Sequence, residues 1–255
     1  MPVDKSDKEF MATLAKGLTV LGSFDKSRPT MTLSQAAQAA GLSRATARRI
    51  LRTLTTLGYV EQSGRQFALS SRILKLGYAY LATQNWIEQA AMPMRQLSEL
   101  FHESCSLAIL QGAEIVYVAR IPASRIMSVA LAVGTRLPAF HTALGRIQLG
   151  YLDDAELWRR LRSLRVEAYT PSTITDIQAL YDRVREDHAQ EFAIVDEELE
   201  RGLRAIAVPI LDRGGQAVAA LNLSTHTTRT TRNEMRERFL PNLRAVAEQI
   251  SASIV

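Results

Sequence analysis

The stretch GLSRATARRILRTLTTLGYVE, residues 41–61, combines a helical apolar pattern with four arginines. At about 100° per residue, one side of such a helix carries only apolar residues, namely Ala47, Ile50, Leu51, Leu54 and Leu57. The other side carries Arg44, Arg48 and Arg52, with Ala45 and Arg49 just beyond them. Glu61 is the only acid of the stretch. Because a solvated helix face normally mixes both signs of charge, the pattern predicts one packed side and one side that faces an anion.

The flanking residues predict a winged helix-turn-helix. A helix over residues 9–24 comes first, and TLSQAAQAAG (32–41) follows it as a helix capped by Thr32 or Ser34 and ended by Gly41. Ser43 can cap the arginine-bearing helix, and Gly58 ends it. The segment YVEQSGRQFALS (59–70) is typical of two strands around a tight Ser63-Gly64 turn. In such a domain the second helix of the pair enters a DNA major groove.

The net positive charge of the protein is concentrated in the same part of the chain. Residues 1–72 carry 11 Lys and Arg against 5 Asp and Glu, whereas the remaining residues carry 20 against 21. A basic domain joined to a near-neutral one favours double-stranded DNA as its partner over the alternative, a merely solubilising face. Since arginine contacts both phosphates and base edges, the candidate DNA-binding residues are Ser43, Arg44, Ala45, Thr46, Arg48, Arg49, Arg52 and Arg65.

Length and composition limit the remaining possibilities. The 255 residues suffice for one large or two modest domains, and the single Cys105 excludes a disulfide framework and a Cys-rich zinc site. MPVDKSDKEF (1–10) lacks the apolar core of a signal peptide, and no apolar run reaches the roughly 18–20 residues of a membrane span. We therefore expect a soluble, cytoplasmic protein without a membrane partner.

The second half of the chain predicts a mixed α/β domain. A helix from about Ser71 to Gln84 is apolar around much of its circumference, so it is either buried or paired with a second copy. After Pro93 the pattern predicts strands at 105–110, 115–120 and 125–133, and a hairpin of 202–211 with 216–224. Helices are expected at 141–152, 153–164, 176–192 and 231–254, with caps at Asp153 and at Thr175 or Asp176, and a kink or break at Pro241.

This second domain shows no pattern of an enzyme or a metal site. The four histidines do not have metal-ligand spacing, and GxSxG, HExxH and phosphate-loop motifs are absent from the sequence. The run Asp196-Glu197-Glu198 is best explained as a solvated loop or as partners for Arg201 and Arg204. Cys105 is expected in the core. We predict no catalytic residue, no metal and no cofactor.

A binding pocket accounts better for the polar residues that remain. Ser128, Asn222 and Ser224 interrupt apolar strands, and Asn222 and Ser224 share one strand face. His141, Thr142 and Ala143 lie where a bend enters a helix, so that free backbone N–H groups there could hold a carboxylate. Arg120 and Arg125 are candidate carboxylate clamps. For each of these residues a purely structural role remains the alternative.

Several motifs, in order, resemble the IclR family of bacterial transcription regulators. They are residues 41–61, FALSSRILKLGYAYL (67–81), RLPAFHTALGR (136–146) and DEELERGLRAIAVPILDRGGQAVAALNLS (196–224). Together with YVARIPASRIMSV (117–129), they are similar to its PcaR/PcaU/PobR branch, which controls protocatechuate and 4-hydroxybenzoate (β-ketoadipate pathway) catabolism. The resemblance runs from about Glu9 to Ser251.

The resemblance implies an α+β fold in three parts. These are a winged helix-turn-helix DNA-binding domain (1–70), a linker helix (71–85) and a GAF-like α/β effector-binding and oligomerisation domain (86–255). It also implies homodimers or tetramers on palindromic operators, and a small aromatic or dicarboxylic acid as effector. With the residues above, the candidate effector-binding set is Arg120, Arg125, Met127, Ser128, His141, Thr142, Ala143, Leu144, Gly145, Asp196, Ala205, Asn222 and Ser224.

One departure from the family pattern bears on the effector. Relatives that sense small keto acids carry an acid near Val195 and a cysteine at Ala205, whereas both positions are apolar here. This argues against a glyoxylate-like ligand and favours an aromatic or longer acid. Two alternatives stay open: an IclR-type regulator of another catabolic pathway, and a small-molecule enzyme with a DNA-binding appendage.

Overall fold

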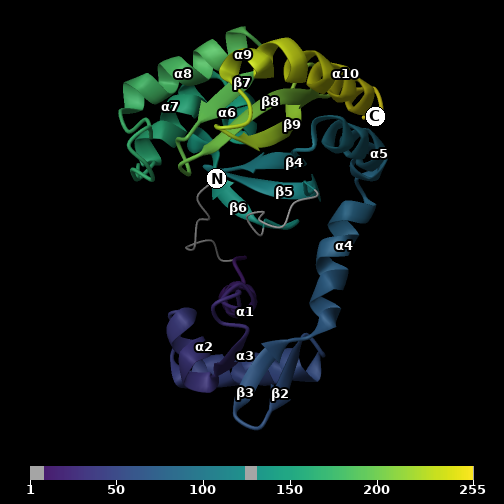
Figure 1. The fold of residues 1–255 in the computed structure, drawn as a ribbon. Helices are drawn as coiled ribbons and strands as arrows, with labels where there is room; N and C mark the ends of the chain where they lie inside the picture. Colours follow the sequence, from purple (N-terminus) through teal and green to yellow (C-terminus); the bar gives the residue numbers. More distant parts are fainter. Residues whose placement is uncertain (1–8, 124–130, 255) are drawn as a thin grey trace. The chain divides into compact units, whose positions relative to one another are not determined.

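The computed structural model describes residues 9–123 and 131–254 and divides into two compact units. The first unit extends to Thr83 and the second begins at Gln84 (Figure 1). Each unit has its own elements and its own buried core, so each is described by itself.

The N-terminal unit is a winged helix-turn-helix, as predicted. Its three-stranded antiparallel sheet has the order β1-β3-β2, and β2 and β3 form the wing. The first strand, β1, was not predicted. It is three residues long, too short for an alternating pattern to stand out. The elements are α1 (Ala12–Leu21), β1 (Thr30–Thr32), α2 (Leu33–Ala39), α3 (Arg44–Thr56), β2 (Val60–Ser63), β3 (Gln66–Leu69), the 3-10 turn η1 (Ser71–Ile73) and α4 (Leu74–Ala82).

Side-chain caps fix the ends of the two central helices. The Thr32 hydroxyl accepts a hydrogen bond from the Gln35 N–H, and the Gln35 side chain accepts one from the Thr32 N–H, so Thr32 rather than Ser34 caps α2. Ser43 caps α3 by accepting from the Thr46 N–H at 3.2 Å. Gly41 adopts φ +63° in the turn between the helices, a conformation that favours glycine.

The predicted apolar side of α3 is buried, with one exception. Ala47, Ile50, Leu51 and Leu54 pack in a core with α1, α2 and the sheet. Leu57, also assigned to that side, is exposed, because the helix ends at Thr56 and Leu57 is its C-cap. The wing turn also differs by one residue from the prediction. Ser63 pairs with Gln66, so Gly64 and Arg65 form the turn and Arg65 lies at its tip.

Two helices of this unit expose apolar side chains. None of the residues of α4 is buried, and Leu74, Leu76, Tyr78 and Tyr80 are all exposed. Burial within the chain, one of the two explanations for this apolar helix, is therefore wrong. Met11, Leu14 and Leu18 of the first helical segment are exposed as well. Such surfaces are typical of sites that a partner covers.

The C-terminal unit is built on a six-stranded antiparallel sheet of order β6-β5-β4-β9-β8-β7. Helices α5 and α10 contact one face, and α6, with α8 and α7 beyond it, covers the other (Figure 1). The strands are β4 (Ser104–Gln111), β5 (Glu114–Ile121), β6 (Arg136–Pro138), β7 (Ala193–Asp196), β8 (Leu203–Leu211) and β9 (Ala217–His226). The helices are α5 (Asn85–Phe101), η2 (Ala139–His141), α6 (Ala143–Leu149), α7 (Asp154–Ser163), α8 (Ile177–Ala189), α9 (Arg232–Glu234), η3 (Met235–Phe239) and α10 (Leu240–Ser251).

The α+β fold class is confirmed, with local differences. The caps of α7 and α8 are Asp153 and Asp176, and Cys105 is fully buried. Helix α5 continues through Pro93, because the buried side of α5 packs against β4, β5 and α10. Strand β7 was not predicted. Of the strand expected at 125–133, residues 125–130 lie outside the described residues, and residues 131–133 form no strand.

The C-terminal helix adapts to Pro241 without ending there. A π-helical turn, η3, immediately precedes α10, and Pro241 occupies the first turn of α10. A proline has no N–H to donate, and the first turn of a helix requires none.

Candidate functional site

A groove between α3 and the wing gathers the predicted DNA-binding arginines. It has a volume of about 680 Å³. The start of α2 and the strands of the wing form its walls, and four arginines project along it. The lining residues are Thr32, Leu33, Ser34, Arg44, Arg48, Arg52, Gln62, Gly64, Arg65 and Phe67.

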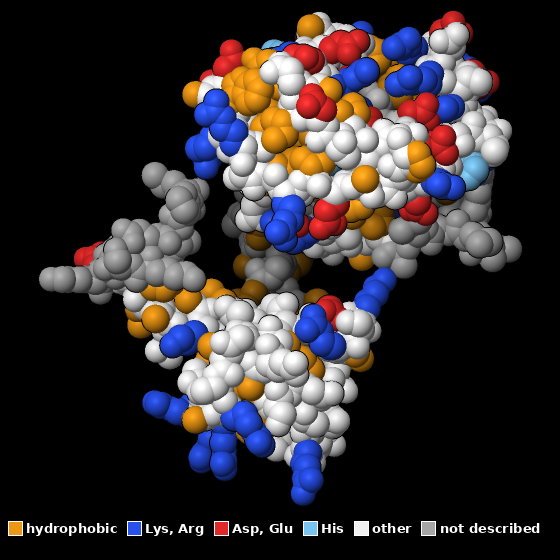
Figure 2. Space-filling model, turned by 90° about the vertical axis from the view of Figure 1, so that its left-hand side faces the viewer, with side chains coloured by type: hydrophobic (Ala, Val, Ile, Leu, Met, Phe, Trp, Pro, Cys, Tyr) orange, Lys and Arg blue, Asp and Glu red, His pale blue; other side chains and the backbone are white. Residues whose placement is uncertain are grey.

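The arginines of this face have no acidic partners. Arg44, Arg48, Arg49, Arg52 and Arg65 are all exposed, and none of them forms an ion pair with a carboxylate of the described residues. Figure 2 shows Lys and Arg side chains projecting from the lower edge of the N-terminal unit. The guanidinium groups are thus free for a polyanion, whose phosphates they can bind through paired N–H donors.

The start of α3 presents short side chains beside these arginines. Ser43 and Ala45 are exposed, and Thr46 is half-buried. The Ser43 hydroxyl donates to the Thr46 hydroxyl at 2.9 Å while it caps the helix. This end of the helix is therefore rigid and narrow, as close approach to base edges requires. Arg49 lies on α3 outside the groove lining.

A second site is a cavity of about 810 Å³ in the C-terminal unit. The sheet forms one wall, the start of α6 another, and the loop before β8 a third. Eight predicted effector-binding residues line it: Arg120, His141, Thr142, Ala143, Leu144, Ala205, Asn222 and Ser224. The structure thus brings together residues that lie more than 100 positions apart in the chain.

The strand register explains how polar residues collect on this wall. Ser106 is the register partner of both Arg120 and Asn222, and Asn222 also faces Ala207. In the next row, Ser104 faces Ser224, which faces Ala205, which in turn faces Val195. Since residues two apart on a strand share a face, both rows point the same way. The wall is therefore polar on β5, β4 and β9, and apolar on β8 and β7.

Arg120 is the cation of this wall. Its guanidinium donates to the Ser106 hydroxyl at 3.2 Å and to the Ser104 hydroxyl at 3.4 Å. It forms no ion pair with a carboxylate of the described residues. Burial lowers the pKa of Arg120, but a guanidinium keeps its charge in proteins. Arg120 can therefore receive the carboxylate of a ligand.

Asn222 leaves an acceptor open at the same wall. Its amide donates to the Ser224 hydroxyl at 2.9 Å, and its Oδ1 has no hydrogen-bond partner among the described residues. Asn222 is almost fully buried. An unpaired buried acceptor costs free energy, which a ligand with a donor would recover.

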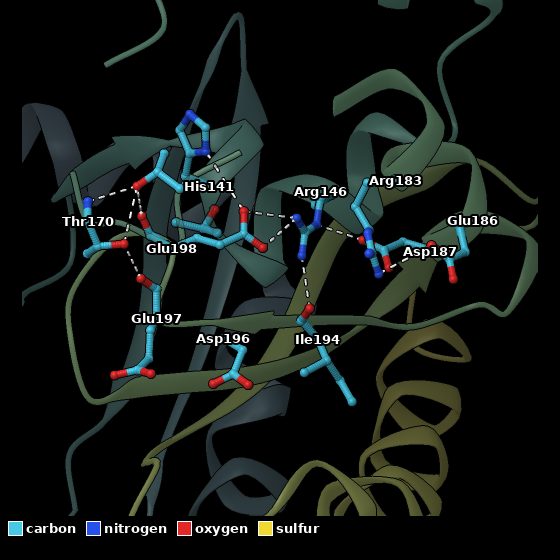
Figure 3. A network of polar contacts seen from close by, with 12 residues as sticks. His141, Arg146, Thr170, Arg183, Glu186, Asp187, Ile194, Asp196, Glu197 and Glu198 are labelled. Atoms are coloured by element: carbon cyan, nitrogen blue, oxygen red, sulfur yellow. Dashed lines mark hydrogen bonds and ion pairs between the residues drawn. The ribbon is translucent and has the colours of Figure 1, made fainter. Parts of the chain in front are cut away.

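A buried ion network lies behind the start of α6 (Figure 3). Arg146 donates through Nη1 to Glu198 Oε1 at 2.8 Å and through Nη2 to the Ile194 carbonyl at 2.9 Å. Its Nε lies 2.7 Å from Asp187 Oδ2. Burial raises the pKa of Asp187 to about 6, although Arg146 and Arg183 oppose the shift. Burial acts in the same direction on Glu198, but its contacts with His141 and Arg146 outweigh it and hold the pKa of Glu198 below its usual range.

The same network anchors the loop that forms the third wall. The Thr173 hydroxyl donates to the Glu198 carbonyl at 2.6 Å, and the Thr170 hydroxyl donates to the Glu197 carbonyl. The Gly202 N–H donates to Glu197 Oε1 at 2.7 Å. The segment 199–203 then lines the cavity.

Several predicted effector residues are placed elsewhere. Asp196 does not line the cavity; it pairs with Arg204 on β8, because it alternates with the lining residue Val195 along β7. Gly145 is also outside the lining, and it allows α6 to approach η2, since a Cβ there would lie 2.3 Å from the Ala139 carbonyl oxygen. Arg125, Met127 and Ser128 lie outside the described residues.

The acidic run is not a solvated loop throughout. Asp196 pairs with Arg204 as expected, but Glu198 is buried against Arg146. Sequence reasoning missed Arg146 and Glu198, and it also missed Ser104, Ser106 and Tyr117 in or beside the cavity wall. Ser106 carries a signal, since it interrupts an apolar strand as Asn222 does, whereas Ser104 follows Glu103 at the start of β4. The Arg146–Glu198 pair joins positions 52 residues apart and leaves no such signal.

Two further observations concern the described residues only. Within 9–123 and 131–254, no three His, Cys, Asp or Glu side chains gather as metal ligands would. In the same ranges, no helix has both the length and the hydropathy that crossing a membrane would require.

Comparison with known proteins matches both units. The IclR helix-turn-helix domain matches residues 13–64, and the IclR C-terminal domain of bacterial transcriptional regulators matches residues 78–252. The Pca regulon regulatory protein of Pseudomonas putida is 41% identical over 96% of this chain and 84% of its own length. A crystal structure of a transcriptional regulator from Rhodococcus sp. RHA1 superposes with a TM-score of 0.85 at 42% identity, covering 96% of this chain and 98% of that one.

A solved ligand complex is also similar. It is the inducer-binding domain of an Acinetobacter PobR transcription factor, a double mutant in complex with 3-hydroxybenzoic acid. Its TM-score is 0.61 at 29% identity, and the match covers 64% of this chain and 96% of that chain.

Proposed function

Because the chain belongs to the IclR family of bacterial transcriptional regulators, we propose that its N-terminal unit binds operator DNA and that its C-terminal unit senses a small carboxylic acid of aromatic catabolism. Such a regulator binds the chromosome in the cytoplasm. Its output is a change in transcription rather than a chemical reaction.

The observation that carries the DNA-binding role is the arginine face of α3 and the wing. Four arginines line one groove without an acidic partner among the described residues, next to a capped helix start with short side chains. The eight residues from Ser43 to Arg65 assigned above are the proposed contacts. Phosphate contacts would hold the unit on DNA, and the start of α3 would read base edges.

The cavity supports the sensing role. It offers one half-buried guanidinium, Arg120, and the unpaired acceptor of Asn222 on the polar part of the sheet wall, beside the apolar residues of β8 and β7. Such a surface suits a small acid with an apolar body. The relatives support the chemical class: one is named for the Pca regulon, and another was solved with 3-hydroxybenzoic acid.

The chain would act as a dimer or tetramer. We assign residues 71–85 as the linker between the DNA-binding part (1–70) and the effector-binding part (86–255). The exposed apolar side chains of α4 support pairing of this linker between two copies. Two copies would place two recognition helices on a palindromic operator, and their contacts would add.

The test combines ligand and DNA binding on the full chain. Protocatechuate, 4-hydroxybenzoate and β-ketoadipate are added to the purified protein, and its melting temperature is recorded. A ligand that prefers the folded state must raise that temperature. The active compound should then change binding to a labelled fragment from upstream of the regulated genes. If no fragment is bound above nonspecific affinity, the regulator role is wrong. If DNA is bound but no acid of this class has an effect, the sensing role is wrong.

A further inference from the structure

Strand β5 contains a β-bulge at the cavity wall. Leu107 of β4 pairs with Ala119 of β5, but the next residue of β4, Ala108, pairs with Tyr117. Val118 therefore has no register partner on β4 and is the extra residue of the bulge. An extra residue of this kind changes which side chains of its strand share a face.

The bulge brings Tyr117 to the face that carries Arg120. The two residues are three positions apart, so a regular strand would place their side chains on opposite faces. Instead, Arg120 pairs with Ser106 and Tyr117 pairs with Ala108, and these two residues of β4 share a face. Both Tyr117 and Arg120 line the cavity. Because two positions along a strand span about 7 Å, the two side chains start close enough to reach one group of a ligand.

Tyr117 adds a hydrogen-bond donor to this wall. Its side chain is almost fully buried, yet its hydroxyl has no hydrogen-bond partner among the described residues. A buried tyrosine hydroxyl usually has such a partner. Burial raises the pKa of Tyr117 and Arg120 opposes the rise, so the hydroxyl lies near the guanidinium. The phenol keeps its proton at neutral pH and can donate a hydrogen bond.

Arg120 is held in position at the same wall. Its two terminal nitrogens donate to serine hydroxyls of β4 at 3.2 and 3.4 Å, which leaves further N–H groups for a ligand. Of the carboxylates that line the cavity, Glu103 pairs with Arg229, and Glu200 is exposed in the loop before β8. Neither of them occupies the Arg120 guanidinium.

We propose that the Tyr117 hydroxyl and the Arg120 guanidinium together hold the carboxylate of the effector. This rests on the proposed sensing role of the cavity. Both oxygens of a carboxylate accept hydrogen bonds, so the group can take donors from the two residues at once. The guanidinium supplies the opposite charge, and the phenol adds a donor from a second direction, which fixes the orientation of the carboxylate as well as its position.

The test is calorimetry on the full-length protein at neutral pH, with 4-hydroxybenzoate, protocatechuate, β-ketoadipate and benzoate as probes. Tyr117→Phe keeps the ring and removes only the hydroxyl. We expect the affinity of each probe that binds to fall by roughly ten- to hundredfold, as is typical of a hydrogen bond to a charged group. The factor should be similar for all of them, since the carboxylate is the only group that they share.

Two measurements separate this contact from a structural role of the hydroxyl. The melting temperature of unliganded Tyr117→Phe should equal or exceed that of the wild type, because burial of a hydroxyl without a partner costs free energy. In Arg120→Gln the carboxylate is no longer fixed beside the hydroxyl. Adding Tyr117→Phe to that variant should therefore lower affinity by less than about threefold.

Tyr151→Phe is the matched control. Tyr151 packs on His188 and does not line the cavity, so this variant should bind every probe as the wild type does.

Four results would overturn the proposal. They are wild-type affinity in Tyr117→Phe, a loss confined to probes with a ring hydroxyl, an equal loss with and without Arg120, and a lowered melting temperature of unliganded Tyr117→Phe. If none of the probes binds the wild type, the sensing role of the cavity fails, and this proposal fails with it. Binding that does not depend on Tyr117 overturns this proposal alone.

Discussion

Arg146 is one of the most enclosed side chains of the C-terminal unit, and each of its contacts reaches a different part of the chain. It joins α6 to the carbonyl of Ile194 on β7, to Asp187 on α8 and to Glu198 in the cavity loop. Removing the arginine would leave two buried carboxylates without a cation, which typically costs several kcal/mol. Arg146 and Asp187 do not line the cavity, so at this scale its walls depend on residues that lie behind them.

Asp187 should make stability depend on pH. Its pKa is raised from 3.8 to about 6 in the folded state, so the folded chain binds the proton more tightly than the unfolded chain. Stability contributed by this group is therefore present below pH 4 and is lost as pH rises through about 6, by about 3 kcal/mol. Asp187→Asn cannot titrate. Urea unfolding of both proteins between pH 4 and 7.5 should show the wild type losing stability relative to the variant. A constant difference across that range would contradict the assignment.

Gly145 should tolerate no side chain. A Cβ at this position would lie 2.3 Å from the Ala139 carbonyl oxygen and 2.4 Å from the Ala139 Cα, so η2 and α6 would have to separate. We expect Gly145→Ala to destabilise the protein by roughly 1–3 kcal/mol and to lower its melting temperature. The control is Gly17→Ala on α1, where a Cβ meets nothing within 4 Å. There alanine should be neutral or stabilising, since glycine costs about 1 kcal/mol within a helix.

At the scale of elements, α3 shows how one helix can serve two environments. Its buried side is fixed by apolar residues at helical spacing, and its exposed side carries arginines that meet no carboxylate of the described chain. Omitting acids from this face leaves the helix without i,i+4 ion pairs, a small loss. The absence of acids also means that no carboxylate on this face repels the phosphate backbone, which is a much larger effect once DNA is near.

The arginine face predicts a specific salt dependence. Arg48→Ala and Arg52→Ala should each weaken operator binding. Where the replaced arginine binds a phosphate, the slope of log affinity against log salt should become shallower by about 0.9. Where it binds a base edge, affinity should instead fall by about 1–3 kcal/mol with little change of slope. Fluorescence anisotropy at roughly 50 to 300 mM salt gives the affinity and the slope for each variant. These measurements distinguish a phosphate contact from a base contact.

Arg28→Ala is the control for these variants, because Arg28 is already paired with Asp25. Its operator affinity and salt slope should match those of the wild type. Unchanged affinity and slope in the α3 variants would exclude this face as the DNA contact.

At the scale of the whole molecule, two units with separate cores divide the work. The N-terminal unit has a net positive charge and a groove of arginines, whereas the C-terminal unit has a near-neutral composition and a cavity. Helix α4, which ends the first unit, has no buried residue. A helix with so much exposed apolar surface gains stability when a second copy covers it.

The exposed side chains of α4 predict that charge will weaken the assembly. Leu76→Lys together with Tyr78→Lys should shift the protein toward smaller species in sedimentation velocity at micromolar concentration. It should also weaken binding to a two-half-site operator more than binding to one half-site, because the contacts of two copies no longer add. Leu100→Lys on α5 is the control, because Leu100 is an exposed leucine in the other unit. If the α4 variant sediments as the wild type does, the copies pair elsewhere.

Local sequence patterns were enough to define the winged helix-turn-helix, the caps at Ser43 and Asp153, the hairpin of β8 and β9, and the shared face of Asn222 and Ser224. These features depend on residues a few positions apart, where helical or strand periodicity and capping act directly. The folded chain was needed to learn that Arg120, Ser106 and Asn222 form one row, that Asp196 turns away from the cavity, and that Glu198 is buried. Strand register and desolvation are set by neighbours many positions away in the chain, so no local pattern records them.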